Sequence, residues 1–183
     1  MLRSQTNVKR KILAATIAAG FVLSIATPVG PAMAAAKKTL VVGSTQGIPQ
    51  LNPIIRTFAY EESLFPLLWS GLSQWTPDGT VKPDLASSWK SNAAGDLWTF
   101  TIRSGVKFSD GSALDAKAVK AVFDYAKKPT TVTQEANKIK IISKVTTSGN
   151  NVIFKLSSPS ALFPEAIAWI KMIKVSEVSN FNK

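Results

Sequence analysis

The chain has 183 residues, of which 45% are hydrophobic and 18% charged, so it is long and apolar enough to bury a core. Its formal net charge is +11, and it contains neither cysteine nor histidine. These absences exclude disulfides, thiolate catalysis, a lipid anchor through cysteine, and the usual general base and zinc ligand. We therefore do not expect an enzyme.

The first 34 residues have the pattern of a secretory signal peptide. A basic stretch ending at Lys11 precedes an apolar run over 12–26, and a Pro/Gly break leads to Ala-Met-Ala at 32–34. The apolar run is about 15 residues long, short of the roughly 20 that a membrane-spanning helix needs, which disfavours a membrane anchor. We expect cleavage after Ala34 or Ala36, and a net charge of +7 once residues 1–34 are removed.

The next segment predicts a strand over 39–43, a loop over 43–53 and a helix over 59–71. Leu64, Leu67 and Leu68 recur at helical spacing, and Pro66 is expected to kink this helix or delay its start. Glu61 and Glu62 lie early in the helix, where its dipole favours anions, and we interpret both as surface charges.

Short strands and turns follow over 72–102. Pro-Asp-Gly at 77–79 predicts one hairpin, and residues 93–96 predict a second reversal, between strands near 88–90 and at 97–102. The second of these strands alternates strongly, which places Trp98, Phe100 and Ile102 on one face. Four of the five tryptophans lie within 69–98 and favour a packed aromatic core over a ligand cage. They are Trp69, Trp75, Trp89 and Trp98.

A turn and the clearest helix come next. We expect Asp110 to be a turn residue at 109–111, because no further oxygen ligands follow at the spacing of a calcium loop. The helix spans 115–128, with Asp115 as N-cap and Lys127 and Lys128 in its last turn. Its apolar stripe comprises Val119, Val122, Phe123 and Ala126.

The remaining segments are shorter. Residues 130–138 are loop or a short helix, 139–147 and 152–157 form a hairpin, 160–170 are helical, and 171–176 begin a strand. The lysines between 127 and 144 lack interleaved aromatic residues, so we expect no nucleic-acid binding and interpret them as a solvated face. Weak attraction to anionic surfaces of the cell envelope stays open.

Four segments, in this order, resemble the family 5 solute-binding proteins of bacterial ABC importers. They are LNP at 51–53, WSGLSQWTPDGTVKPDLASSW at 69–89, WTFTIRSGVKFSDG at 98–111 and NVIFKLSSPSALF at 151–163. The resemblance implies a mixed α/β (α+β) fold, an incomplete lobe of the type II periplasmic-binding-protein kind with short antiparallel strands and flanking helices. Residues 35–183 then correspond to the N-terminal portion of the family domain, and a second lobe is missing.

The resemblance also implies a function. We expect a non-enzymatic, exported solute-binding component of an ABC importer, periplasmic or extracellular, that imports peptides and binds them only weakly without the second lobe. Expected partners are a peptide or other small solute and the membrane permease, with no cofactor and no stable oligomer. The alternatives are nickel or another small solute as cargo, or a stand-alone protein-interaction module.

The ligand contacts carried over from the family fall on a loop. By position before LNP, they correspond to Gln46, Gly47 and Ile48, where an extended ligand is held through main-chain hydrogen bonds. A glycine allows another backbone to approach closely. An ordinary surface loop is the alternative interpretation.

Overall fold

The computed structural model of the chain describes residues 41, 43, 47, 51–55, 61–129, 131, 133 and 135–181. The expected signal peptide lies outside these residues, as do Gln46, Ile48 and most of the expected first strand. The chain divides into two units, Met1–Thr45 and Gln46–Lys183. Everything below concerns the second unit.

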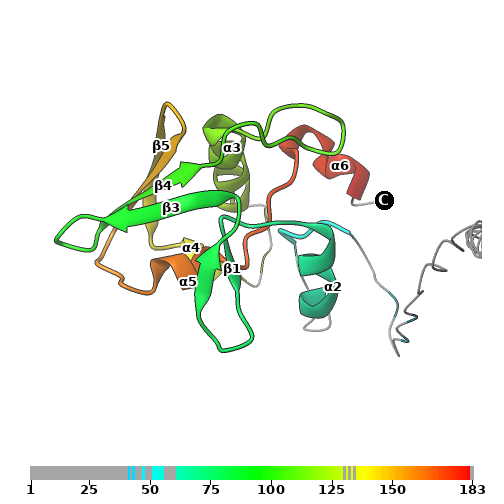
Figure 1. Cartoon of the computed structure of the whole chain (residues 1–183), viewed down its shortest axis with the longest axis horizontal. Coiled ribbons are helices and arrows are strands. Elements are labelled where there is room, and N and C mark those ends of the chain that lie inside the picture. The colour runs from blue at the N-terminus through cyan, green and yellow to red at the C-terminus, as the bar shows by residue number, and fades with distance from the viewer. Residues whose placement is uncertain are drawn as a thin grey trace, which may run out of the picture. The chain divides into compact units, whose positions relative to one another are not determined.

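A four-stranded antiparallel sheet, of order β3-β4-β6-β5, is the centre of the fold (Figure 1). Its strands are β3 (Ala86–Ser91), β4 (Leu97–Ile102), β5 (Ile142–Ser148) and β6 (Asn151–Leu156). Trp98, Phe100 and Ile102 are buried on β4, which confirms the face predicted from the alternating sequence. On β6, Phe154 is buried opposite Trp98. The two central strands therefore supply one continuous apolar face.

Helix α3 (Ala116–Ala126) packs on strands β5 and β6. The Phe123 and Phe154 rings meet edge to face, 4.7 Å apart between centroids. Oδ1 of Asp115 accepts a hydrogen bond from the Ala118 amide at 2.9 Å, which confirms the predicted N-cap. The helix ends earlier than predicted, because Lys127 is its C-cap and Lys128 lies beyond it.

A second, two-stranded sheet pairs β1 (Ser73–Trp75) with β2 (Val81–Pro83) around the predicted Pro-Asp-Gly turn. Asp78 holds this turn together by accepting hydrogen bonds from the hydroxyl groups of Thr76 and Thr80. Gly79 has a φ of +81°, which glycine adopts without strain.

Helix α2 (Glu61–Leu68) runs through Pro66, so this proline does not delay its start, and the helix buries a different face from the one expected. Phe65 is 2% exposed and Glu61, one turn earlier, is fully buried, whereas Leu67 is 79% exposed. The interpretation of Glu61 as a surface charge is therefore wrong. Helical geometry places residues four apart on one side, so the burial of Phe65 carries Glu61 inward with it. The side chain of Glu62 is not described.

Three other boundaries differ from the predictions. Ile139 ends helix α4 (Ala136–Ile139), so the following strand starts only at Ile142. The helix expected over 160–170 is limited to α5 (Phe163–Ile167). Segment 171–176 makes a single bridge, between Gly71 and Lys171, and then enters the 3-10 turn η1 (Val175–Glu177) and helix α6 (Val178–Phe181). Residues 170–173 are all buried, so this segment runs through the core and does not alternate as a strand at a sheet edge does.

The aromatic core is built mainly from phenylalanines. Phe100, Phe154 and Phe163 are fully buried and contact one another, with ring centroids 5.3–6.1 Å apart. Trp89 and Trp98 join this cluster through Phe100. The predicted four-tryptophan core is only partly correct. Trp69 meets Phe65 edge to face and Trp75 lies against Trp169, both outside the sheet cluster.

Candidate functional site

The loop predicted to contact ligand is described only at Gly47. This glycine is exposed, and an added Cβ would meet no atom within 4 Å. Neither packing nor a left-handed backbone therefore requires glycine here, and ligand contact by Gln46, Gly47 and Ile48 stays a prediction.

The far end of this loop is firmly held. Asn52 is fully buried, and its Oδ1 accepts a hydrogen bond from the Ile54 amide at 3.0 Å. Ile54 is itself 1% exposed and belongs to the hydrophobic core. The LNP segment at 51–53, which follows the predicted ligand loop, is thus anchored in the core by Asn52 and by the neighbouring Ile54.

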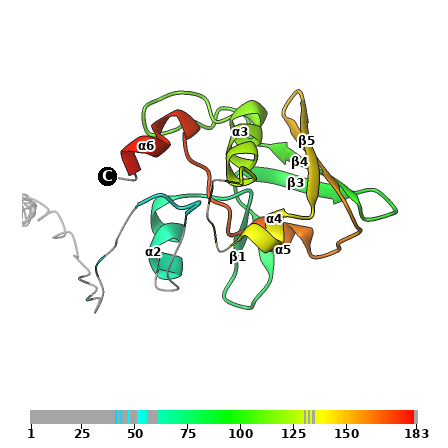
Figure 2. The same cartoon turned by 180° about the vertical axis from the view of Figure 1, so that it is seen from behind.

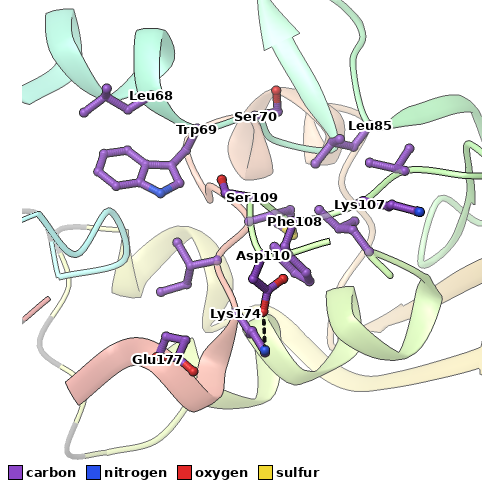
Figure 3. A pocket seen from close by; sticks show the side chains of 14 residues that line it. Leu68, Trp69, Ser70, Leu85, Lys107, Phe108, Ser109, Asp110, Lys174 and Glu177 are labelled. Atoms are coloured by element: carbon purple, nitrogen blue, oxygen red, sulfur yellow. Dashed lines mark hydrogen bonds and ion pairs between the residues drawn. The ribbon is translucent and has the colours of Figure 1, made fainter. Parts of the chain in front are cut away.

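The described residues also form an open pocket of about 650 Å³, which the sequence did not predict (Figure 3). It lies where the end of α2, the turn after β4 and the segment before η1 meet. Its lining is Leu68, Trp69, Ser70, Leu85, Val106, Lys107, Phe108, Ser109, Asp110, Leu114, Met172, Ile173, Lys174 and Glu177. Pockets of a few hundred cubic ångströms accommodate small molecules or large side chains.

Backbone hydrogen bonds, one of them between segments far apart in sequence, hold the walls of the pocket. The Met172 amide donates to the Ser70 carbonyl at 2.8 Å, and the Leu114 amide donates to that of Val106 at 3.0 Å. Gly71, next to Ser70, is closely surrounded by backbone: an added Cβ would lie 3.0–3.3 Å from three carbonyl oxygens. Glycine is needed there for close approach of the chain.

An ion pair crosses one side of the pocket (Figure 3). Oδ2 of Asp110 accepts from Nζ of Lys174, and Oδ1 accepts from the amide and hydroxyl of Ser112 at 2.9 and 2.6 Å. The hydrogen bond from Lys174, followed by those from Ser112, holds the pKa of Asp110 well below its usual range. The same bond raises the pKa of Lys174.

The turn role predicted for Asp110 is confirmed, whereas its lysine partner was missed. No local signal marks that pairing, because 64 residues separate the two side chains. The aromatic and aliphatic walls of the pocket, Trp69 and Phe108 among them, suit an uncharged apolar group. Within the part of the chain that the structure describes, no three His, Cys, Asp or Glu side chains group as a metal site. No helix in that part is long and apolar enough to cross a bilayer.

Residues 80–182, more than half of the chain, match the family described as bacterial extracellular solute-binding proteins, family 5 Middle. The probable D,D-dipeptide-binding periplasmic protein DdpA of Escherichia coli is 33% identical over 122 residues, which cover 64% of this chain and 23% of that protein. The glutathione-binding protein GsiB of Salmonella paratyphi A is 32% identical over 122 residues, which cover 67% and 24% of the two chains.

A solved structure agrees with these relatives. The NikZ protein of Campylobacter jejuni, in complex with Ni(L-His), superposes with a TM-score of 0.65 at 26% identity, covering 75% of this chain and 27% of that one. The chain thus spans about a quarter of the length of the proteins it resembles. The fold is a mixed α/β part of a type II periplasmic-binding-protein lobe, as expected from the sequence. Matched in sequence over β2 to α6 and in three dimensions over most of its length, the chain belongs to the family 5 bacterial extracellular solute-binding proteins.

Proposed function

We propose that this chain acts as the N-terminal part of the peptide-binding component of an ABC importer. The family match over 80–182 carries the proposal, and the relatives named for dipeptide and glutathione binding support a peptide as the solute. In this proposal residues 1–34 are an export signal, residues 35–183 begin the binding domain, and the protein works outside the cytoplasm as a monomer beside its permease. It needs no cofactor, catalyses no reaction and binds no nucleic acid.

The proposed ligand contact is the loop of Gln46, Gly47 and Ile48. Main-chain groups of an exposed loop can pair with an extended peptide as an added strand does, and the exposed Gly47 leaves room for that approach. The pocket of Figure 3 is less suited to this task, because the ion pair of Asp110 and Lys174 occupies one side of it and aromatic and aliphatic side chains form much of its wall.

Calorimetry with a mixture of dipeptides and tripeptides tests the proposal. Because the loop touches only one side of a ligand, we expect a Kd in the millimolar range, about −4 kcal/mol. Gly47→Val is expected to abolish the heat of binding. Ser109→Trp, which adds bulk at the pocket, serves as the matched control and is expected to leave the heat unchanged.

Three outcomes would contradict this assignment. Micromolar affinity would mean that these residues enclose the ligand on more than one side. If Ser109→Trp lost binding while Gly47→Val kept it, the binding site would be the pocket and not the loop. Peptide hydrolysis during the titration would replace the binding role with an enzymatic one.

A nickel complex is the second candidate solute, because the C. jejuni structure contains Ni(L-His) and is 26% identical to this chain. The sequence has no histidine or cysteine of its own, so the metal would be recognised as a chelate. Titration with Ni²⁺ and L-histidine together, against either alone, distinguishes this candidate from peptide binding. A third possibility, the protein-interaction module, predicts that neither solute produces heat.

A further inference from the structure

Four lysines gather where helix α3 ends and strand β5 begins. We name this surface the basic corner and define it by Lys127, Lys128, Lys140 and Lys144. Nζ of Lys127 donates to the Ser143 carbonyl at 3.3 Å, so the C-cap of α3 lies against the start of β5. Figure 2 shows α4, which Lys140 follows directly, beside the start of β5.

The basic corner carries almost no compensating negative charge. The sequence has no Asp or Glu over 125–134 or over 136–164. The two acids closest in sequence already pair with other lysines, Asp124 with Lys120 and Glu135 with Lys138. Glu135 also has only 4% of its side chain exposed. Lys144 lies opposite Lys155 on β6, and Lys155 is likewise paired with Asp96. Each of these carboxylates is thus engaged by another lysine, and the four lysines give the corner a net positive charge.

The shape and chemistry of the corner favour a diffuse anionic surface as its partner. Lys128, Lys140 and Lys144 are exposed, and none of the four lines the pocket of Figure 3. Lysine is a flexible point charge without the planar fork with which arginine grips a single phosphate. Tyr125 lies beneath Lys128 at 5.8 Å, so its ring is already engaged and not free to stack on a base.

We propose that the basic corner docks this protein on the anionic headgroups of a lipid bilayer. Each lysine held near such a surface strengthens binding about fivefold, and four together suffice for measurable association. Lys144 on edge strand β5 has a second use, since a charge on an edge strand discourages pairing with another chain. If the lysines served only to prevent pairing of the sheet edge with another chain, the protein would show no preference for anionic lipid.

Vesicle sedimentation tests the proposal. The full chain is mixed with vesicles of pure phosphatidylcholine or of an equimolar mixture with phosphatidylglycerol. The ratio of the two partition coefficients removes the apolar contribution of the N-terminal run. Comparing this ratio between variants removes the contribution of the basic residues before that run, which every variant shares. We expect Lys140→Ala with Lys144→Ala to lower this ratio about 25-fold, and high salt to abolish the preference.

The matched control is Lys82→Ala with Lys90→Ala. It removes the same charge from exposed lysines on β2 and on β3, which forms the opposite edge of the four-stranded sheet from β5. The control ratio is expected to stay close to that of the unaltered protein. If both double variants lowered the ratio of partition coefficients equally, the preference for anionic lipid would depend only on net charge, and the proposal would be overturned.

Two further results would also overturn it. One is equal binding to both kinds of vesicle, and the other is salt-sensitive capture by polyglutamate without capture by anionic vesicles, which would assign the corner to an acidic protein. Thermal unfolding of each variant establishes that it is folded. The pair Lys140→Gln and Lys144→Gln repeats the test with longer polar side chains if the alanine pair is unfolded.

Discussion

Replacing Phe100 by alanine should remove the centre of the aromatic core. Phe100 is fully buried, and its ring contacts four others at centroid distances of 5.6–6.4 Å. Those rings belong to Trp89, Trp98, Phe154 and Phe163, which come from strands β3, β4 and β6 and helix α5. Four neighbours on four elements cannot all move into the space that one ring leaves.

The expected loss follows from that geometry. Truncation of a buried phenylalanine costs about 3–5 kcal/mol, and the rigid surroundings of Phe100 place it in the upper part of this range. A domain of ordinary stability has about 5–15 kcal/mol in total, so the variant keeps only part of it. Leu97→Ala is the control on the same strand. Leu97 is 37% exposed, and its truncation is expected to cost about 1 kcal/mol or less.

Urea unfolding followed by tryptophan fluorescence measures both values. The midpoint for Phe100→Ala should fall far below that for Leu97→Ala, with similar slopes. If Phe100→Ala destabilised the protein no more than Leu97→Ala, the sheet cluster would not be its main stabilising core, and the argument from ring contacts would be refuted.

Three further predictions concern single positions. Gly71→Ala should lower the free energy of unfolding by about 1–3 kcal/mol, because its Cβ would lie 3.0–3.3 Å from backbone carbonyls, whereas Gly47→Ala should leave urea unfolding unchanged. Asp115→Ala should cost about 1 kcal/mol in the same assay, since the Ala118 amide loses its cap; an unchanged midpoint would deny the cap any energetic role. Asp110→Asn should remove part of the acid sensitivity of thermal unfolding. The pKa of Asp110 in the folded protein lies below its ordinary value of 3.8, so its stabilising effect is present above about pH 4 and lost as the pH falls. Melting temperatures of the two proteins should converge on acidification, and a constant difference would contradict the ion pair.

The sequence was a good guide wherever a feature depends on neighbouring residues. Alternation along β4, the Pro-Asp-Gly hairpin and the Asp115 cap are set within a few residues, and the structure confirms all three. Contacts between distant segments were not predictable. The bond of Asp110 to Lys174 and the bridge of Gly71 to Lys171 join stretches whose local patterns contain no sign of each other.

Glu61 shows the same limit from within one helix. The helix sequence has leucines at helical spacing and two glutamates in its first turn, and the pattern predicted that the leucine side is buried and the glutamates are exposed. In the structure the helix instead buries the side that carries Phe65 and Glu61, and Leu67 is exposed. Leucine is more often buried than glutamate, so this orientation is the opposite of what residue type alone favours. Tertiary packing therefore overrode the local hydrophobic pattern here.

Two tryptophans lie in different parts of the fold: Trp98 in the sheet cluster, and Trp69 beside helix α2, which we call the rim of the core. Among the described residues, the ring contacts of Phe100, Phe154 and Phe163 lie within residues 89–163, so no ring of α2 takes part in the sheet cluster. Helix α2 buries Phe65 and Glu61 but leaves Leu67 and Leu68 79% and 52% exposed. An element with so little buried surface opens at a lower free energy than the core. Trp69 reports on that rim and Trp98 on the sheet, so a sheet variant that shifts only the Trp98 signal would show the two parts to be energetically separate.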